Sequence, residues 1–450
     1  MTKDFTRGSV LKNIVIFSIP FLFSYFLQTL YGMADLFVTG QFYSASVITA
    51  VSCGSQIMHM ITVIIVGFTM GTTVLVGRAA GSDNKSEASR ITGNSFSFFL
   101  ILSIFISAVL MFFCNNILEV MSVPQISRPQ TKLYLTICFT GIPFITVYNI
   151  FSAVFRGLGD SKTPMYFVLF TCLINIFLDY FFMGILGLHA EGAALATVIS
   201  QAASVALMII FCLKSKKNIK IKKSDLVPDG NIVKSIARIG VPVAVQDGFI
   251  QISFLTITVI ANMRGVQVAA AVGIVEKIIC FLFLVPSSML SSVSAISAQN
   301  IGACKHYRAK KTLFCGIILS ASLGMFFSII LQFLSEPVLR LFTYESKVVE
   351  LGTQYLKSYV FDCVFAAVHF SFSGFFCAYG YSMASFLHNI ISIILVRIPG
   401  AAFASRYYPE NLFPMGIAAP AGSALSAVIC VIIYRMLFCI KKSTFQKLNK

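Results

Sequence analysis

Twelve long apolar stretches constrain this chain more than any other feature of its sequence. A helix that crosses a bilayer needs about 20 mostly apolar residues, and stretches of that length recur from residue 14 to residue 440. Only 11% of the 450 residues are charged and 57% are hydrophobic, which excludes an ordinary water-soluble protein. We therefore predict an all-α integral membrane protein with twelve transmembrane helices. The predicted spans lie at about 14–38, 49–76, 92–114, 131–155, 163–185, 191–213, 235–262, 268–298, 311–334, 350–377, 382–405 and 415–440.

The basic residues predict which connecting segments face the cytoplasm. Of the 34 Lys and Arg residues, 25 lie in alternate segments, which are the N-terminus, 77–91, 156–162, 214–238, 299–311 and the tail from Arg435. Because cytoplasmic loops carry an excess of Lys and Arg, we expect a multi-pass protein of the cell membrane with both termini in the cytoplasm. The net charge of +17 is then a topology signal. We expect contact with membrane lipid and none with nucleic acid.

The two halves of the chain resemble each other at a shift of about 221 residues. At this shift, residues 151–155 (FSAVF) align with residues 372–376 (FSGFF), and Pro20 aligns with Pro242 at a shift of 222. Six spans in each half predict two six-helix lobes, related by a pseudo-two-fold axis along the membrane normal, with a central cavity between them. The expected domains are an N-terminal lobe over 1–213, a basic cytoplasmic linker over 214–234, and a C-terminal lobe with a cytoplasmic tail over 235–450.

Charged side chains inside the spans are the candidates for function, since each costs about 2.5–3.5 kcal/mol to insert. In the first half these are Asp35 and Asp179; Asn175 lies one turn before Asp179, and Thr197 lies near the start of the next span. Two carboxylates with amide and hydroxyl oxygens suit a sodium ion or a shared proton. We predict that these four residues form a cation-coupling site. The alternative is a hydrogen-bonded pair that only locks two spans together.

The remaining polar groups in the spans are candidates for the lining of a substrate cavity. Gln28 lies seven residues before Asp35 on the same helix face. Arg397 could neutralise Asp362 or Glu276, and a structural ion pair is as plausible as a contact with substrate. The full set is Gln28, Tyr31, Gln251, Glu276, Asp362 and Arg397.

Patterns typical of enzymes and resident cofactors are missing from the sequence. The twelve Cys form no CxxC pair, and there is no HExxH motif and no Ser/His/Asp set. The glycine-rich turn at 156–164 (RGLGDSKTP) lacks the spacing of a phosphate-binding loop. We therefore expect no enzyme, no cofactor, and no metal beyond a possible sodium ion at Asp35, Asn175, Asp179 and Thr197.

Four motifs in these spans resemble the multidrug and toxic compound extrusion (MATE) family. They are the first-span pattern of Pro20, Gln28, Tyr31, Asp35 and Gly40, the turn at 156–164, residues 298–303 (AQNIGA) and residues 396–399 (VRIP). The resemblance runs from about residue 12 to residue 440. It implies a secondary antiporter that exports amphipathic organic cations, which is multidrug efflux, in exchange for protons or sodium by alternating access.

The resemblance is nearest to the DinF-like branch of this family. It implies a central role for the acid at Asp35, joined by Asn175, Asp179 and Thr197. In the second half Asp362 lies four residues too early and Cys377 replaces the arginine found at Arg156. The resemblance therefore does not predict a cation site in the second lobe.

Export of cations has two alternatives. A flippase for a lipid-linked oligosaccharide or another amphipathic lipid would need a basic cavity to hold a pyrophosphate, whereas the spans hold five acidic and two basic residues. A channel or a membrane-embedded enzyme would need a filter segment or a nucleophile, and neither is seen. We expect a monomer that acts on small organic cations.

Overall fold

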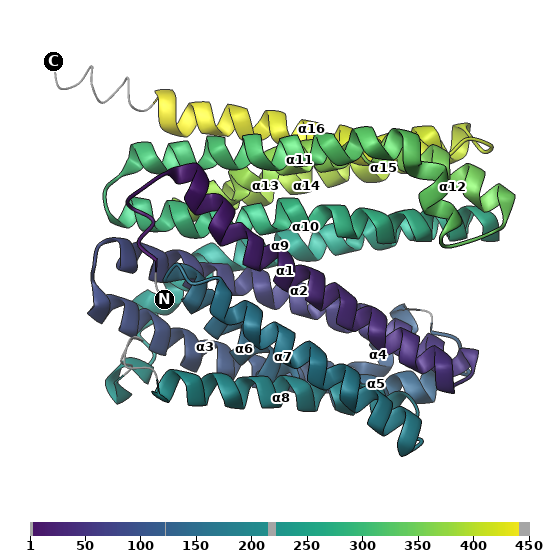
Figure 1. Cartoon of the computed structure of the whole chain (residues 1–450), viewed down its shortest axis with the longest axis horizontal. Coiled ribbons are helices and arrows are strands. Elements are labelled where there is room, and N and C mark those ends of the chain that lie inside the picture. Colours follow the sequence, from purple (N-terminus) through teal and green to yellow (C-terminus); the bar gives the residue numbers. More distant parts are fainter. Residues whose placement is uncertain (1–2, 122, 215–221, 441–450) are drawn as a thin grey trace. The chain divides into compact units, whose positions relative to one another are not determined.

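The computed structural model describes residues 3–121, 123–214 and 222–440, and these residues form helices joined by short turns (Figure 1). The predicted linker residues 215–221 and the tail 441–450 lie outside the described residues. The first half contains α1 (Val10–Phe42), α2 (Ala45–Gly81), α3 (Lys85–Phe112), α4 (Cys114–Val120), α5 (Arg128–Thr140), α6 (Ile142–Gly157), α7 (Lys162–Asp179), the π-helical turn η1 (Tyr180–Ile185) and α8 (Ala190–Lys214).

The second half begins with the short 3-10 turn η2 (Lys223–Leu226). It continues with α9 (Gly230–Asn262), α10 (Val266–Gly302), α11 (His306–Arg340), α12 (Ser346–Tyr359), α13 (Asp362–Ala378), α14 (Ser382–Ser392), the π-helical turn η3 (Ile393–Arg397), α15 (Ile398–Tyr407), α16 (Phe413–Arg435) and the π-helical turn η4 (Met436–Ile440).

The number of membrane-spanning helices agrees with the prediction. Within the described residues, eleven helical stretches are long and apolar enough to cross a bilayer, and the bent pair of α5 and α6 makes the twelfth. The two helices of this pair meet at Gly141 with a bend of 46°. Pro143 follows in the first turn of α6, where its missing N–H needs no partner in the helix. The predicted fold class of an all-α membrane protein with twelve spans is therefore confirmed.

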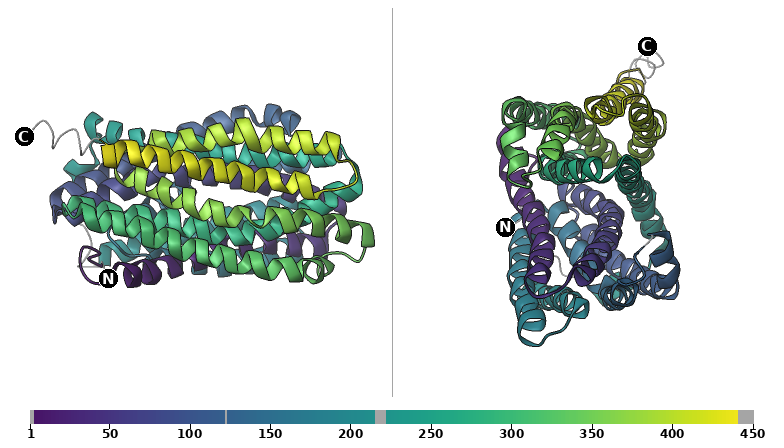
Figure 2. Two further views of the ribbon diagram at one scale, coloured as in Figure 1. Left: turned by 90° about the horizontal axis from the view of Figure 1, so that it is seen from above. Right: turned by 90° about the vertical axis from the view of Figure 1, so that its right-hand side faces the viewer.

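Contacts divide the chain into two compact units. The first unit contains residues 1–7, 16–240 and 298–304, and the second contains residues 8–15, 241–297 and 305–450. Within the first unit α7 packs against α8, and α2 and α3 pack against α6. Within the second unit α11 and α16 both pack against α13; these helices are green to yellow in Figure 2. Each unit has its own apolar core.

The end of the predicted linker is docked onto the first unit. The Asn94 side chain on α3 donates to the backbone oxygen of Asp225, and Ser97 donates to that of Leu226. Arg90 of α3 forms an ion pair with Asp229 at 2.9 Å. Residues 222–229 therefore form part of the surface of the first unit, and α9 begins directly after them at Gly230.

Turns in the two halves repeat the same backbone geometry at the shift found in the sequence. Gly159 after α6 and Gly380 after α13 both have positive φ, 84° and 78°, which glycine adopts at little cost. The N–H of Asp160 donates to the oxygen of Phe155, and the N–H of Tyr381 donates to that of Phe376, both at 2.8 Å. The duplication therefore extends from the sequence to the helix ends.

The AQNIGA motif at the end of α10 holds the N-terminal segment in the first unit. Gln299 accepts a hydrogen bond from the N–H of Phe5 at 3.1 Å and donates to the oxygen of Gly157 at 2.9 Å. Phe5 is buried, and its ring lies 4.8 Å from the ring of Phe17. A Cβ at Gly81 would collide with the carbonyl of Gln299, so this crossing requires glycine.

Candidate cation-coupling site

The two acids predicted to couple cations lie together inside the first unit. Asp35 is on α1 and is 2% exposed, while Asp179 is the last residue of α7 and is fully buried. The carboxyl group of Asp35 interacts with that of Asp179 and with the side chain of Asn175, which lies one turn earlier on α7. The structure thus brings together three of the four predicted residues.

Many polar atoms at this site have no partner. Among the described residues, no hydrogen bond is made by the buried atoms Asp35 Oδ1, Asp179 Oδ1 and Oδ2, Asn175 Oδ1 and Nδ2, and Thr197 Oγ1. Buried polar atoms are almost always hydrogen-bonded in folded proteins. A set of buried oxygens without donors fits a group that supplies positive charge, such as a sodium ion or a proton.

Thr197 lies on α8, which packs along α7 in the first unit. Its side chain is 7% exposed, and its hydroxyl is one of the unpartnered atoms. Within the described residues, the hydroxyl makes no hydrogen bond to Asp35 or Asp179. No group of three or more His, Cys, Asp or Glu in the described part of the chain could hold a metal ion.

Local structure fixes the position of both acids. The Thr39 hydroxyl donates to the backbone oxygen of Asp35 at 2.6 Å, one turn further along α1. Directly after Asp179 the chain widens into the π-helical turn η1, a form that often marks functional sites. Tyr43, directly after α1, shares its single hydroxyl proton between the oxygens of Met183 at 2.8 Å and Leu188 at 3.1 Å. These bonds tie the end of α1 to the segment that follows Asp179.

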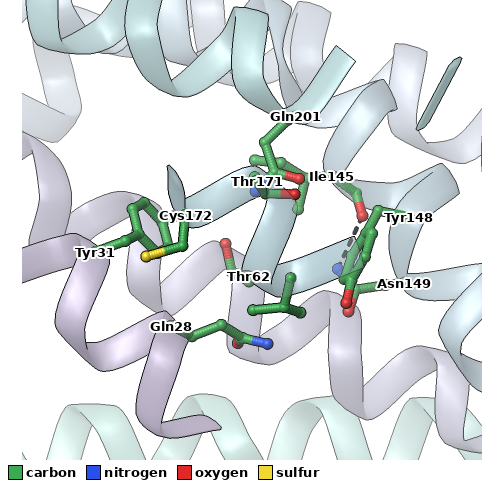
Figure 3. Close-up of a pocket in the computed structure, with 10 residues that line it drawn as sticks. Gln28, Tyr31, Thr62, Ile145, Tyr148, Asn149, Thr171, Cys172 and Gln201 are labelled. Carbon is green, nitrogen blue, oxygen red and sulfur yellow. Dashed lines mark hydrogen bonds between the residues drawn. The ribbon is translucent and has the colours of Figure 1, made fainter. Parts of the chain in front are cut away.

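A small polar cavity adjoins the acids, and we call it the first-unit cavity. Its volume is about 40 Å³, and its polar lining includes Gln28, Tyr31, Asn149, Thr171 and Gln201 (Figure 3). Tyr31 interacts electrostatically with both Asp35 and Asp179, so the cavity begins next to the acid pair. Pockets that hold a drug-sized ligand measure about 300–1,000 Å³. The first-unit cavity can therefore hold water or an ion, but not an organic substrate.

The predicted polar residues of the second half form a separate buried cluster. Arg397 ends the π-helical turn η3 and lies 3.8 Å from Asp362 Oδ2. It donates to the Tyr359 hydroxyl at 2.7 Å and lies over the ring of Phe254 at 4.7 Å. Of the two acids that the sequence offered as partners, Asp362 makes the ion pair.

Glu276 and Gln251 relate differently to this cluster. Glu276 interacts with Arg397 electrostatically and accepts a hydrogen bond from Thr258 at 3.2 Å. Gln251 is half-buried on α9 and makes no hydrogen bond to the cluster among the described residues. The structure therefore groups Glu276, Asp362 and Arg397, and leaves Gln251 apart.

Two buried histidines were not singled out by the sequence. The rings of His369 and His388 lie 5.6 Å apart. His388 forms hydrogen bonds with the hydroxyls of Ser373 at 2.9 Å and Ser426 at 3.2 Å, whereas Nδ1 of His369 has no partner among the described residues. Their place inside apolar spans was the available signal, because a polar ring there needs a partner or a role.

The polar residues of the first-unit cavity were also missed, apart from Gln28 and Tyr31. Thr171 and Asn175 are four residues apart on α7, as are Thr197 and Gln201 on α8, so each pair shares a helix face. This spacing was visible in the sequence. The signal was weak because uncharged polar residues are common in membrane helices.

Comparison with protein families gives a match over most of the chain. The model of the MatE family matches twice, at residues 20–181 and at residues 242–403. The two matches begin 222 residues apart, in agreement with the duplication read from the sequence.

Curated bacterial proteins match this chain over nearly its full length. It is 25% identical over 451 residues to the probable multidrug resistance protein YoeA of Bacillus subtilis, covering 99% of this chain and 97% of that protein. It is 29% identical to the probable multidrug resistance protein YpnP of the same organism, covering 92% and 93%. The multidrug export protein MepA of Staphylococcus aureus is 22% identical, covering 96% and 95%.

Solved structures share the fold. A crystal structure of a MATE protein in complex with MaL6 has a TM-score of 0.91 at 20% identity, covering 99% of this chain and 100% of that one. An outward-facing multidrug resistance MATE transporter has a TM-score of 0.90 at 20% identity, covering 98% of both chains.

Proposed function

The chain belongs to the MatE family of multidrug efflux transporters, and from this premise we propose that it is a secondary antiporter that exports amphipathic organic cations in exchange for protons or sodium. We place it in the cell membrane as a monomer with both termini in the cytoplasm. The basic residues of the connecting segments support this orientation.

The observation that carries the proposal is the buried acid pair with its unpartnered oxygens. Leaving a buried polar atom without a partner costs about 1–3 kcal/mol, and more if the atom is charged. Asp35 and Asp179 therefore form a site that is stabilised when a cation or a proton arrives. The spans hold more acidic than basic residues, which favours a cationic substrate over the anionic lipid of a flippase.

The geometry suggests how ion binding couples to movement of the helices. Two carboxylates repel each other when both are charged, and a shared proton or a bound sodium ion removes that repulsion. Because Asp35 is on α1 and Asp179 is on α7, loading the site draws these helices together, and releasing the ion lets them separate. A cationic substrate competes for the same negative charge, so ion and substrate bind in turn while the protein alternates access between the two sides.

Dye efflux from vesicles tests this proposal. The purified protein is reconstituted, and ethidium transport is driven first by an imposed sodium gradient and then by an imposed pH gradient. We expect Asp35→Asn and Asp179→Asn to lose transport while still inserting in the membrane. The matched control is Asp83→Asn, the same change at an exposed turn residue with positive φ, which asparagine tolerates.

The gradient that drives transport in the wild type identifies the coupling ion. Unchanged efflux in Asp35→Asn, at normal levels of inserted protein, contradicts the coupling role of the acid pair. Loss of efflux in Asp83→Asn as well would show that the assay responds to any change of charge.

A further inference from the structure

Polar residues continue along the first unit beyond the acid pair. On α7, Thr171 and Asn175 precede Asp179 at intervals of four residues, and on α6 the residues Asn149 and Ser152 are three apart. The first-unit cavity lies between these helices, with Gln201 of α8 in its lining (Figure 3). Because residues three or four apart lie on one helix face, α6 and α7 each carry a row of polar side chains.

The lining is suited to hold water. Among the described residues, Gln201 Oε1 of the lining is buried without a hydrogen-bond partner. Two further hydroxyls on α6, Thr146 Oγ1 and Ser152 Oγ, are also buried without a partner among the described residues, although they do not line the cavity. A volume of about 40 Å³ accommodates about three water molecules at roughly 10–15 Å³ of cavity volume each. Water in this cavity would give a cation or a proton a route from the acid pair towards the end of α6.

Tyr148 lies between the cavity and the C-terminal end of α6. It lines the cavity, and its hydroxyl donates to the oxygen of Pro164 in the first turn of α7 at 3.3 Å. It also interacts with Arg156, which lies two turns further along α6. We call this series of polar groups, from Asp35 through the cavity lining and Tyr148 to Arg156, the polar route.

Arg156 places a buried positive charge at the end of this series. Arg156 is 8% exposed, and its guanidinium lies 6.0 Å from the ring centroid of Phe21. It makes no ion pair with any described residue. Buried arginines are normally paired, because an isolated charge is costly to bury. A charge kept in this way at the end of a polar route raises the energy of any cation that enters.

We propose that Arg156 is an electrostatic barrier that prevents cations from leaking between the acid pair and the α6–α7 end of the first unit. This proposal rests on the proposed function, since the barrier would protect the ion gradient that the acid pair uses. It acts by repulsion and does not bind the transported ion.

The second half of the chain supports this assignment by contrast. At a shift of 221, Cys377 occupies the position of Arg156, and Phe370 occupies that of Asn149. At a shift of 222, Ile257 occupies that of Asp35. The half that lacks an acid at the position of Asp35 therefore also lacks an arginine at the position of Arg156.

The test measures leak without substrate. The protein is reconstituted in liposomes that contain a pH-sensitive dye, and proton entry is followed after an acid pulse; a parallel assay follows entry of radioactive sodium. We expect Arg156→Gln to raise the leak of one of these ions roughly tenfold or more, because a unit charge a few ångströms from the route is removed. Arg156→Lys, which keeps the charge, should leak like the wild type.

A second pair of variants keeps the test decisive if Arg156→Gln does not fold. Ser152→Asp places a carboxylate one turn from Arg156 and neutralises the barrier, so it should leak, whereas the uncharged Ser152→Asn should not. Addition of Asp179→Asn to a leaking variant should reduce the leak. Equal leak in Arg156→Gln and Arg156→Lys, or no leak in folded Arg156→Gln and Ser152→Asp, overturns the proposal.

Failure of the barrier can be distinguished from failure of the proposed function. If Asp35→Asn abolishes dye efflux but the Arg156 and Ser152 variants leak no more ions than the wild type, the acid pair couples transport and only the barrier proposal is wrong. If Asp35→Asn transports normally, the proposed function is wrong whatever the leak measurements show.

Discussion

Gln299 makes the sharpest test of how the N-terminal segment is held. Its side chain is 3% exposed and joins the N–H of Phe5 to the carbonyl of Gly157. Gln299→Ala leaves both backbone groups without this partner, and the loss at the Phe5 N–H alone removes roughly 1–3 kcal/mol of the free energy that holds the segment in place. Since 1.4 kcal/mol corresponds to a factor of ten, the segment should open roughly 5- to 140-fold more often.

Hydrogen exchange measures this opening directly. The exchange rate of the Phe5 amide is followed by mass spectrometry of an N-terminal peptide, because it reports how often the segment leaves its site. Trypsin gives a second readout, since Lys3 and Arg7 flank the buried ring. The matched control is Gln267→Ala, the same change on the same helix, where the side chain is exposed and contacts Glu345.

Exchange and cleavage should rise in Gln299→Ala and stay at the wild-type level in Gln267→Ala. If residues 3–7 exchange equally slowly in Gln299→Ala and in the wild type, the two hydrogen bonds do not hold the segment and the reasoning is refuted. Equal acceleration in both variants would trace the effect to α10 as a whole.

Three further changes test other parts of the fold through the thermal stability of the purified protein in detergent. Asp362→Leu should destabilise it by about 3–5 kcal/mol because it leaves Arg397 as an uncompensated buried charge. Arg397→Leu added to it should recover most of the loss, and no recovery would contradict the ion pair. Gly159→Ala should destabilise by more than the roughly 1–2 kcal/mol of a left-handed alanine, because the new Cβ also collides with a backbone carbonyl; Gly187→Ala, with nothing within 4 Å, should show the conformational cost alone. Tyr43→Phe should cost roughly 1–3 kcal/mol by leaving two carbonyls without a donor, and an unchanged melting temperature would show that water replaces the hydroxyl.

The spans could be predicted from the sequence because membrane insertion is decided by local composition. Each stretch of about 20 apolar residues must satisfy its own backbone hydrogen bonds, so it forms a helix whatever it packs against. The acids inside those stretches could also be selected from the sequence, because a charged side chain in a span is costly to insert and usually has a functional role. Asp35 and Asp179 were found in this way although 144 residues separate them.

Partners across helices could not be predicted from spacing alone. The sequence left Arg397 between Asp362 and Glu276, and only packing placed its guanidinium 3.8 Å from Asp362. It treated the arginine in the turn at 156–164 as part of a cytoplasmic loop, and the structure buries it at the end of α6. A helix fixes which residues share a face, but not which other helix covers that face.

By itself, then, the sequence determined the twelve spans, the duplication and the acids that lie in the membrane, because these depend on hydrophobicity and on intervals along one helix. Only the tertiary structure decided which oxygens remain without partners, that Gln299 would clasp a segment almost three hundred residues earlier, and that Arg156 would lie buried beyond a polar cavity. Those features depend on side chains from several helices meeting in space, and hydrogen bonds and charge repulsion at a few ångströms are set by that meeting.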